Sequence, residues 1–157
     1  MAGKFTRRAA LLAGLVMCTA TASADIMQKL EPQRTLVRFP PELQQHFLAN
    51  MRDHLAAVAQ IQTALAEGQF DEAGRIAGAR LGMDSPSAAA CKPGMEHMSQ
   101  MAKLMPAGMR KAGRRMHDAA DRFAAEMKSA GNYRAAISSL SKITQACVMC
   151  HAEYRVH

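Results

Sequence analysis

Apolar residues recur every three or four positions along most of the chain, and this spacing predicts a succession of amphipathic helices. The first begins at Pro40-Pro41, because proline is tolerated in the first turn of a helix, and it ends at Gly68. A second helix follows over residues 71–82. A third helical region covers about residues 95–127, where Pro106 either kinks it or splits it in two. The last helix begins near Asn132, a favourable N-cap residue.

The same spacing predicts which side chains face inward on the first and last helices. On the first helix they are Leu43, Phe47, Met51, Leu55, Val58, Gln62 and Leu65. On the last helix they are Tyr133, Ile137, Leu140, Ile143, Cys147, His151 and Tyr154. Four such helices with short connections predict an all-α fold, an antiparallel four-helix bundle over residues 40–157. Residues 25–39 are predicted to be a flexible lead-in.

Composition supports the same fold class. Hydrophobic residues make up 49% of the chain, but aromatic residues only 4%, and Trp is absent. The apolar surface comes from Ala, Leu and 13 Met residues, which favour helices over strands. We therefore expect helices to supply the core.

The N-terminus has the layout of a cleavable secretory signal peptide over residues 1–24. Its parts are a basic region with Lys4, Arg7 and Arg8, an apolar run over residues 9–20, and Ala22-Ser23-Ala24 before Asp25. Thr6-Arg7-Arg8 faintly resembles a twin-arginine signal, and Cys18 lies in a poor lipoprotein box. Ordinary secretion to the periplasm is the preferred interpretation. No later segment is apolar for long enough to cross a membrane.

The formal net charge of +7 overstates the basicity of the exported protein. Loss of the three signal-peptide cations leaves +4. A basic cluster remains, formed by Lys103, Arg110, Lys111, Arg114 and Arg115. No aromatic residues are interleaved with it, which argues against nucleic-acid binding and favours a solvated helix face.

The strongest chemical signal is the C-x-x-C-H motif of Cys147, Cys150 and His151, the attachment signature of c-type haem. On a helix, residues three apart lie on one face, so both sulfurs can bond the same porphyrin. His151 can then reach the iron as an axial ligand. The motif predicts one covalent haem c.

Other uses of the motif fit less well. A zinc site needs two more Cys or His ligands at suitable spacing. A thioredoxin-like redox pair needs a strand before its helix. Two cysteines three apart on one helix face also have poor geometry for a structural disulfide.

The segment from Cys147 to Arg155, which reads C-V-M-C-H-A-E-Y-R, resembles the C-terminal C-x-x-C-H-x-x-Y-R of class II c-type cytochromes. These are the cytochrome c-prime proteins and their Met-ligated low-spin relatives. The resemblance implies an antiparallel four-helix bundle with haem bound by the C-terminal helix. Only the final helix carries specific similarity. The absence of Trp and the Met-rich stretch over residues 95–116 depart from the family pattern.

In that family, a residue of the first helix covers the haem face opposite the His. We expect Met51 to take this distal position as an iron ligand, and a thioether there would raise the reduction potential. Met51 as an ordinary core residue is the open alternative. His54, three residues later, is a less favoured distal ligand. If neither binds, the iron is five-coordinate and can take nitric oxide or carbon monoxide.

The segment over residues 95–116 suggests a third function, because thioethers bind Cu(I). Its methionines are Met95, Met98, Met101, Met105, Met109 and Met116, with His97 and Cys91 nearby. Core packing explains them more simply. His117 is expected outside the core, and Cys91 is a free reactive thiol or a dimer link.

We therefore expect a periplasmic carrier of single electrons rather than an enzyme, since no catalytic residue set stands out. Its partners are redox proteins, with small gases as alternative ligands and a homodimer as an open alternative.

Overall fold

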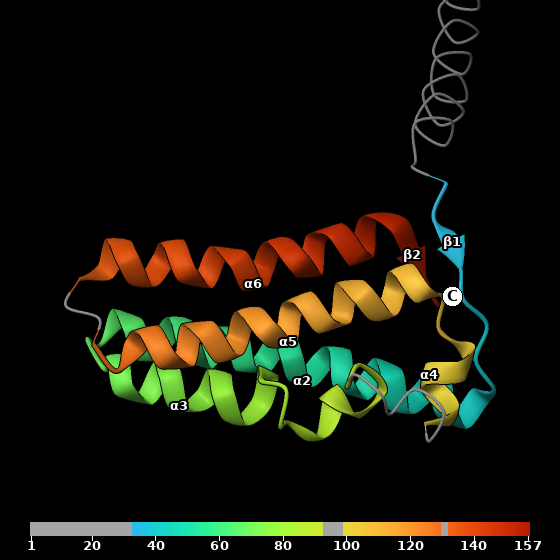
Figure 1. Ribbon diagram of the computed structural model, residues 1–157, viewed down its shortest axis with the longest axis horizontal. Helices are drawn as coiled ribbons and strands as arrows, with labels where there is room; N and C mark the ends of the chain where they lie inside the picture. Colours follow the sequence, from blue (N-terminus) through green and yellow to red (C-terminus); the bar gives the residue numbers. More distant parts are fainter. Residues whose placement is uncertain (1–32, 93–98, 130–131) are drawn as a thin grey trace, which may run out of the picture. The chain divides into compact units, whose positions relative to one another are not determined.

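The computed structural model describes residues 33–92, 99–129 and 132–157, and residues 34–157 form one compact unit. This unit is all-α and bundle-like, as predicted (Figure 1). Its helices are α2 (Pro41–Ala66), α3 (Phe70–Leu81), α4 (Gln100–Leu104), α5 (Ala107–Met127) and α6 (Tyr133–Glu153), with a 3₁₀ helix η1 (Pro86–Ala90). Two short strands complete it, β1 (Thr35–Leu36) and β2 (Tyr154–Arg155).

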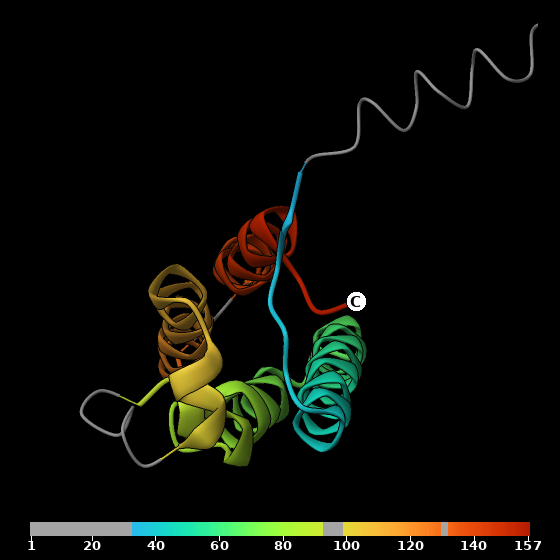
Figure 2. The ribbon, with the colours of Figure 1, turned by 90° about the vertical axis from the view of Figure 1, so that its right-hand side faces the viewer.

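The four long helices pack in chain order. α2 lies on α3, α3 on α5, and α5 on α6, and successive helices run in opposite directions (Figure 1). The backbones of α2 and α6, both described in full, do not pack closely against each other. Figure 2 looks along the helices and shows α6 in red standing apart from α2 in teal. The ring of helices is therefore loosest between its first and last members.

Local sequence signals place the helix ends close to the predicted positions. Pro41 occupies the first turn of α2, and Gly68 follows the helix with a φ of 75°, a conformation that favours glycine. The side chain of Asn132 accepts a hydrogen bond from the Ala135 N–H and caps α6. Pro106 separates α4 from α5, so of the two alternatives at this proline, the split is the one observed.

The prediction of which side chains face inward is partly wrong for α2 and α6. On α2, Leu55 is 72% exposed and Gln62 is exposed. On α6, Tyr133, Ile137 and His151 are also exposed. The faces that are buried comprise His54, Ala57, Ile61, Ala64 and Leu65 on α2, and Ala136, Ser139, Leu140, Ile143 and Ala146 on α6. Small Ala side chains let neighbouring helices approach, so the buried face is rotated toward them and away from the larger apolar residues.

The segment predicted as a flexible lead-in, residues 25–39, is held by a strand pairing in the part that the structure describes. β1 pairs in parallel with β2, and the Val37 N–H donates to the Arg155 carbonyl at 2.8 Å. Val37 and Phe39 are buried. The partner strand lies more than a hundred residues away, so no local pattern could reveal this pairing. Residues 1–32, including the predicted signal peptide, lie outside the described residues.

Two hydrophobic clusters form the core. The main cluster joins α2, α3, α5 and α6 around Phe123, Ile61 and Ile143. The end cluster lies where the chain termini of the compact unit meet, and it includes Val37, Phe39, Met109, Tyr154 and Val156. The C-x-x-C-H motif lies in α6 close to the end cluster.

Candidate functional site

The two cysteines of the motif bridge the two clusters. Cys147 is half-buried against the main cluster, and Cys150 is half-buried against the end cluster. Burial raises the pKa of both thiols above its ordinary value. Both side chains are therefore neutral thiols that face the interior at neutral pH.

The apolar core is interrupted at the level of these cysteines. On α2, the cluster residues stop at Leu48 and resume at Ala57. On α5, they stop at Met109 and resume at Met116. Polar side chains lie in and next to this break. Buried ones are His54 of α2, His117 of α5, which follows Met116, and Ser85 before η1, and Ser87 within η1 is half-buried.

The polar atoms of these side chains form hydrogen bonds with one another or with the backbone. His54 Nε2 lies 2.8 Å from Ser87 Oγ, and Ser87 Oγ lies 3.1 Å from Ser85 Oγ. His117 Nδ1 donates to the Leu81 carbonyl at 2.7 Å. The two imidazole rings meet edge to face, with centroids 5.8 Å apart. His117, expected outside the core, is thus buried, because this backbone carbonyl supplies the hydrogen bond that a buried imidazole needs.

Burial keeps both histidines neutral. It lowers the pKa of His54 to about 4, with a smaller contribution from His117, and it lowers the pKa of His117 as well. The Ser87–His54 pair resembles a nucleophile and base, but an imidazole with this pKa is a weak base at neutral pH. With its Nε2 engaged by Ser87, His54 is also poorly placed to bind a metal beside α6.

One edge of α2 faces α3 and the other faces the end of α6. Arg80 of α3 hydrogen-bonds Gln60 and Asp53, which marks the α3 side. Gln44 Nε2 donates to the Val156 carbonyl at 2.5 Å, which marks the α6 side. Met51 and Leu55 continue the stripe of Gln44 by helical spacing. Half-buried Met51 and exposed Leu55 therefore lie on the edge of α2 toward α6.

The matching edge of α6 carries His151. Lys142 pairs with Glu126 of α5 at 4.0 Å, which marks the α5 side of the helix. Tyr133 packs on Phe70 after the α2–α3 turn, with ring centroids 5.1 Å apart, which marks the α2 side. Helical spacing places Val148 and His151 on the side of Tyr133. Val148 is 66% exposed, and His151 is exposed.

The α2 edge and the α6 edge therefore present apolar and metal-ligating side chains across the loosest part of the bundle. Met51 and Leu55 lie on one edge, and Cys147, Val148 and His151 lie on the other. Leu55 and Val148 are largely exposed, and burial of both against a group seated between the edges would be favourable. This donor set and these apolar walls fit a covalently attached haem.

The methionines of the Met-rich segment that the structure describes serve as core. Met101, Met105 and Met109 belong to the end cluster, and Met116 belongs to the main cluster. Met95, Met98 and His97 lie outside the described residues. Among the residues described, no group of three or more His, Cys, Asp or Glu side chains is arranged to hold a metal ion.

Cys91 is buried against α5, where its Sγ occupies the space beside Gly113. Burial raises the pKa of this thiol to about 11, so the reactive thiolate is scarce at neutral pH. Both the burial and the pKa oppose the predicted roles of reactive group and dimer link.

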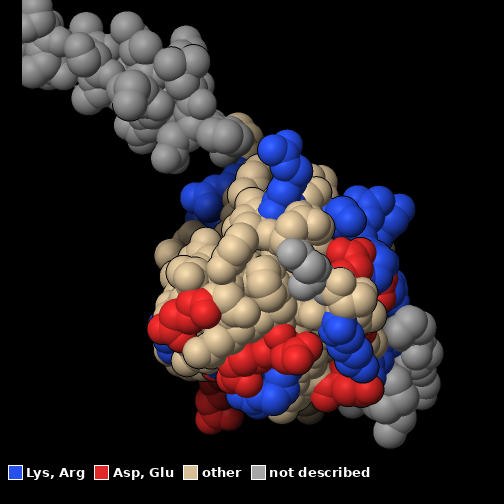
Figure 3. Space-filling model, turned by 90° about the vertical axis from the view of Figure 1, so that its left-hand side faces the viewer, with Lys and Arg blue, Asp and Glu red and all other residues tan. Residues whose placement is uncertain are grey.

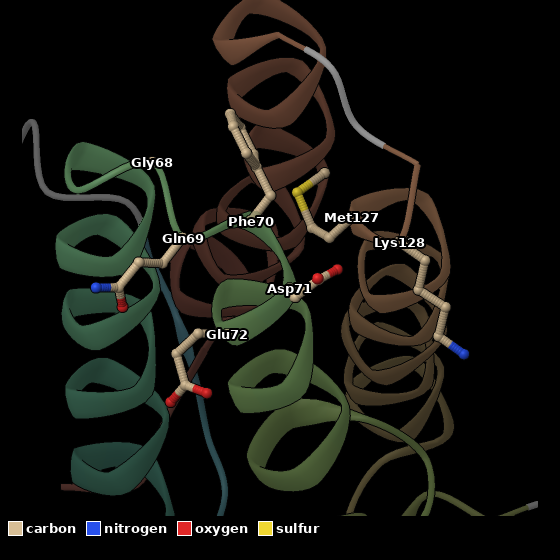
Figure 4. Close-up of a pocket in the computed structure, with 7 residues that line it drawn as sticks. All are labelled: Gly68, Gln69, Phe70, Asp71, Glu72, Met127 and Lys128. Carbon is tan, nitrogen blue, oxygen red and sulfur yellow. The ribbon is translucent and has the colours of Figure 1, made fainter.

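The described surface of the bundle includes two hollows that could hold a small ligand or a partner's side chains. One, of about 460 Å³, opens at the end that carries the α2–α3 turn (Figure 4). Its wall is polar in part, and Glu72 beside it is already paired with Arg75. It lies far from the motif along α6. The other, of about 440 Å³, lies between α5 and α6 beside Met149.

Comparison with protein-family models, curated proteins and solved structures gave no match. No helix among the described residues is long and apolar enough to cross a membrane.

Proposed function

We propose that this protein is an exported c-type cytochrome that carries single electrons through one haem bound to Cys147 and Cys150. The supporting observation is that the C-x-x-C-H motif spans the break between the two clusters, beside the open edges of α2 and α6. In this proposal the helices form an antiparallel four-helix bundle whose C-terminal helix holds the haem. The signal-peptide pattern over residues 1–24 assigns the protein to the periplasm.

Each residue of the motif would make a different bond to the haem. Cys147 and Cys150 are neutral thiols on one face of α6 and would form the two thioether bonds. His151 would bind the iron, since its imidazole lies on the open edge and makes no competing hydrogen bond among the described residues. When bound, the haem supplies a one-electron couple between ferric and ferrous iron. Leu55 and Val148, the apolar side chains on the two edges, would help to exclude water from that couple.

Met51 is the proposed ligand on the opposite side. It belongs to neither cluster, it is half-buried, and it lies on the α2 edge one turn after Leu48, which packs against the same end cluster as Cys150. Its thioether is therefore at the level of the motif. A six-coordinate, low-spin site suits electron transfer, because the ligands change little between oxidation states.

Absorption spectroscopy of the protein expressed with its signal peptide and a periplasmic haem-attachment system tests the proposal. We expect a c-type spectrum that survives denaturation and acid extraction, because thioether bonds keep the haem on the chain. The double variant Cys147→Ala/Cys150→Ala should lose this signal. Cys91→Ala is the matched control and should keep it, since Cys91 lies outside the motif.

Addition of carbon monoxide to the reduced protein distinguishes the two haem functions. An unchanged low-spin spectrum supports the electron carrier. A high-spin spectrum that shifts with the gas would instead assign the protein to binding nitric oxide or carbon monoxide. Wild-type protein without covalent haem would contradict both.

A further inference from the structure

The groove between α5 and α6 lies beside the helical turn that carries the haem-attachment motif, on the side of α6 opposite His151. Gly108, Lys111 and Arg115 line it from α5, and Met149 and Glu153 line it from α6. Met149 lies between the two cysteines of the motif and is 49% exposed. We propose that this groove is the docking site of an acidic electron-transfer protein, an inference that rests on the proposed haem function.

The first argument for this partner is the charge of the groove. Lys111 and Arg115 are exposed and lie one helical turn apart on α5. Within the described part of the chain, no carboxylate forms an ion pair with either. Arg122 extends the stripe by two further turns, past Asp118. Glu153 of α6 also lines the groove and accepts a hydrogen bond from the Tyr154 hydroxyl at 2.8 Å, but this neutral donor does not offset its charge. Lys111 and Arg115 outnumber Glu153, so the lining of the groove carries a net positive charge.

The second argument is the apolar side chain at the centre of the groove. Protein interfaces combine an apolar centre with a polar rim, and methionine is enriched in them. Met149 provides such a centre, and Lys111 and Arg115 provide the rim. Gly108 allows Tyr154 to pack closely against α5, because a Cβ at this position would clash with the Tyr154 hydroxyl. A partner seated here would contact the helical turn that carries both cysteines.

The same charges argue against a second copy of the chain as the occupant. A two-fold symmetric contact through the groove would bring together two linings that are both net positive, which is less favourable than contact with an acidic surface. A partner with clustered Asp and Glu gains both attraction and faster encounter. An acidic protein is thus the occupant that the groove favours.

Oxidised flavodoxin, a strongly acidic protein, is a suitable probe, because its binding requires no electron transfer. The test compares the wild-type protein with Lys111→Glu/Arg115→Glu. The matched control is Lys128→Glu/Arg134→Glu, which changes the net charge equally at the opposite end of the bundle. That end mixes acidic and basic side chains, as Figure 3 shows. Circular dichroism verifies that each variant is folded.

We expect the groove variant to bind flavodoxin about tenfold more weakly at low salt, and the control to stay within about twofold of wild type. Reduction of the haem by flavodoxin hydroquinone should slow in parallel, and the difference should vanish at high ionic strength. Equal losses in both variants, or none, would overturn the docking site while the haem spectrum leaves the proposed function intact.

Two further outcomes would show that the groove has a different occupant, and either would overturn the inference. One is groove-dependent binding to phosphatidylglycerol vesicles without binding to flavodoxin. The other is a wild-type dimer that the groove variant converts to monomers. A protein without covalent haem that still binds flavodoxin through the groove would overturn the proposed function and leave an acidic partner without an electron-transfer role.

Discussion

Met51 is the single residue on which the chemistry of the proposed site depends most. We expect Met51→Leu to convert a low-spin iron to a high-spin iron that binds carbon monoxide and has a lower reduction potential, because the thioether ligand is lost. Met116→Leu is the matched control, since Met116 is buried in the main cluster and the same change there removes no ligand. Absorption spectra before and after carbon monoxide give the result. Identical spectra for wild type and Met51→Leu would show that Met51 is not a ligand.

The buried histidine pair makes stability depend on pH. The pKa of folded His54 is lowered to about 4, whereas an unfolded His titrates near 6.5. The unfolded chain therefore binds more protons, and stability falls as pH drops through the window from about 6.5 to about 4. The loss is about 3 kcal/mol for this group. His117, Asp53 and Arg80 surround it, and the lowered pKa of His117 acts in the same direction.

Denaturant unfolding at several pH values tests this dependence. His54→Gln can keep a hydrogen bond to Ser87 but cannot titrate, so its stability should decline less between pH 7 and pH 4. Its stability at pH 7 should be lower by about 1 kcal/mol, as for other altered buried hydrogen bonds. Parallel pH profiles for the variant and the wild type would contradict the assignment of this slope to His54.

At the scale of the elements, the contact between α3 and α5 depends on glycine. A Cβ on Gly74 would lie 2.9 Å from Met127 Cβ and 3.1 Å from the Ala124 carbonyl oxygen. A Cβ on Gly78 would lie at an ordinary 3.4 Å from Ala124 Cβ. Gly74→Ala should lower the free energy of unfolding by about 1–3 kcal/mol, because α3 must move off α5. Gly78→Ala should raise it by up to about 1 kcal/mol, since Ala favours helix.

Thermal or urea unfolding of the two variants measures this difference. The positions lie one turn apart on one helix, so helix propensity contributes alike to both. Equal stabilities for Gly74→Ala and Gly78→Ala would contradict the close approach of α3 to α5 at Gly74.

The elements also show where sequence reasoning succeeds and where it fails. The helix ends could be predicted, because proline, glycine and capping residues influence the backbone only within about one turn. The residues concerned are Pro41, Gly68, Pro106 and Asn132. The inward faces could not be predicted fully, because a helix with apolar residues on a wide arc has several ways to turn. Leu55 belongs to the arc of α2 that faces α6, where helix packing is loose.

On the scale of the whole molecule, the main cluster joins buried side chains of all four long helices, none of which belongs to the C-x-x-C-H motif. We therefore expect Cys147→Ala/Cys150→Ala, which cannot hold haem, to remain helical and cooperatively folded. Its melting temperature should lie below that of the haem-loaded protein, because a group bound only by the folded state stabilises it. Far-ultraviolet circular dichroism during heating checks both statements. A haem-free variant without helical signal would show instead that the haem is needed to organise the bundle.

The sequence by itself determined the all-α class, the positions of the helices and the motif, because these depend on periodicity, caps and residue spacing within a few turns. Only the tertiary structure decided that His117 is buried on the Leu81 carbonyl, and that residues 35–37 join the end of α6. It also decided that Lys111 and Arg115 lie beside Met149. Each of these contacts joins residues far apart in the chain. Their formation depends on how whole helices pack, which no local pattern encodes.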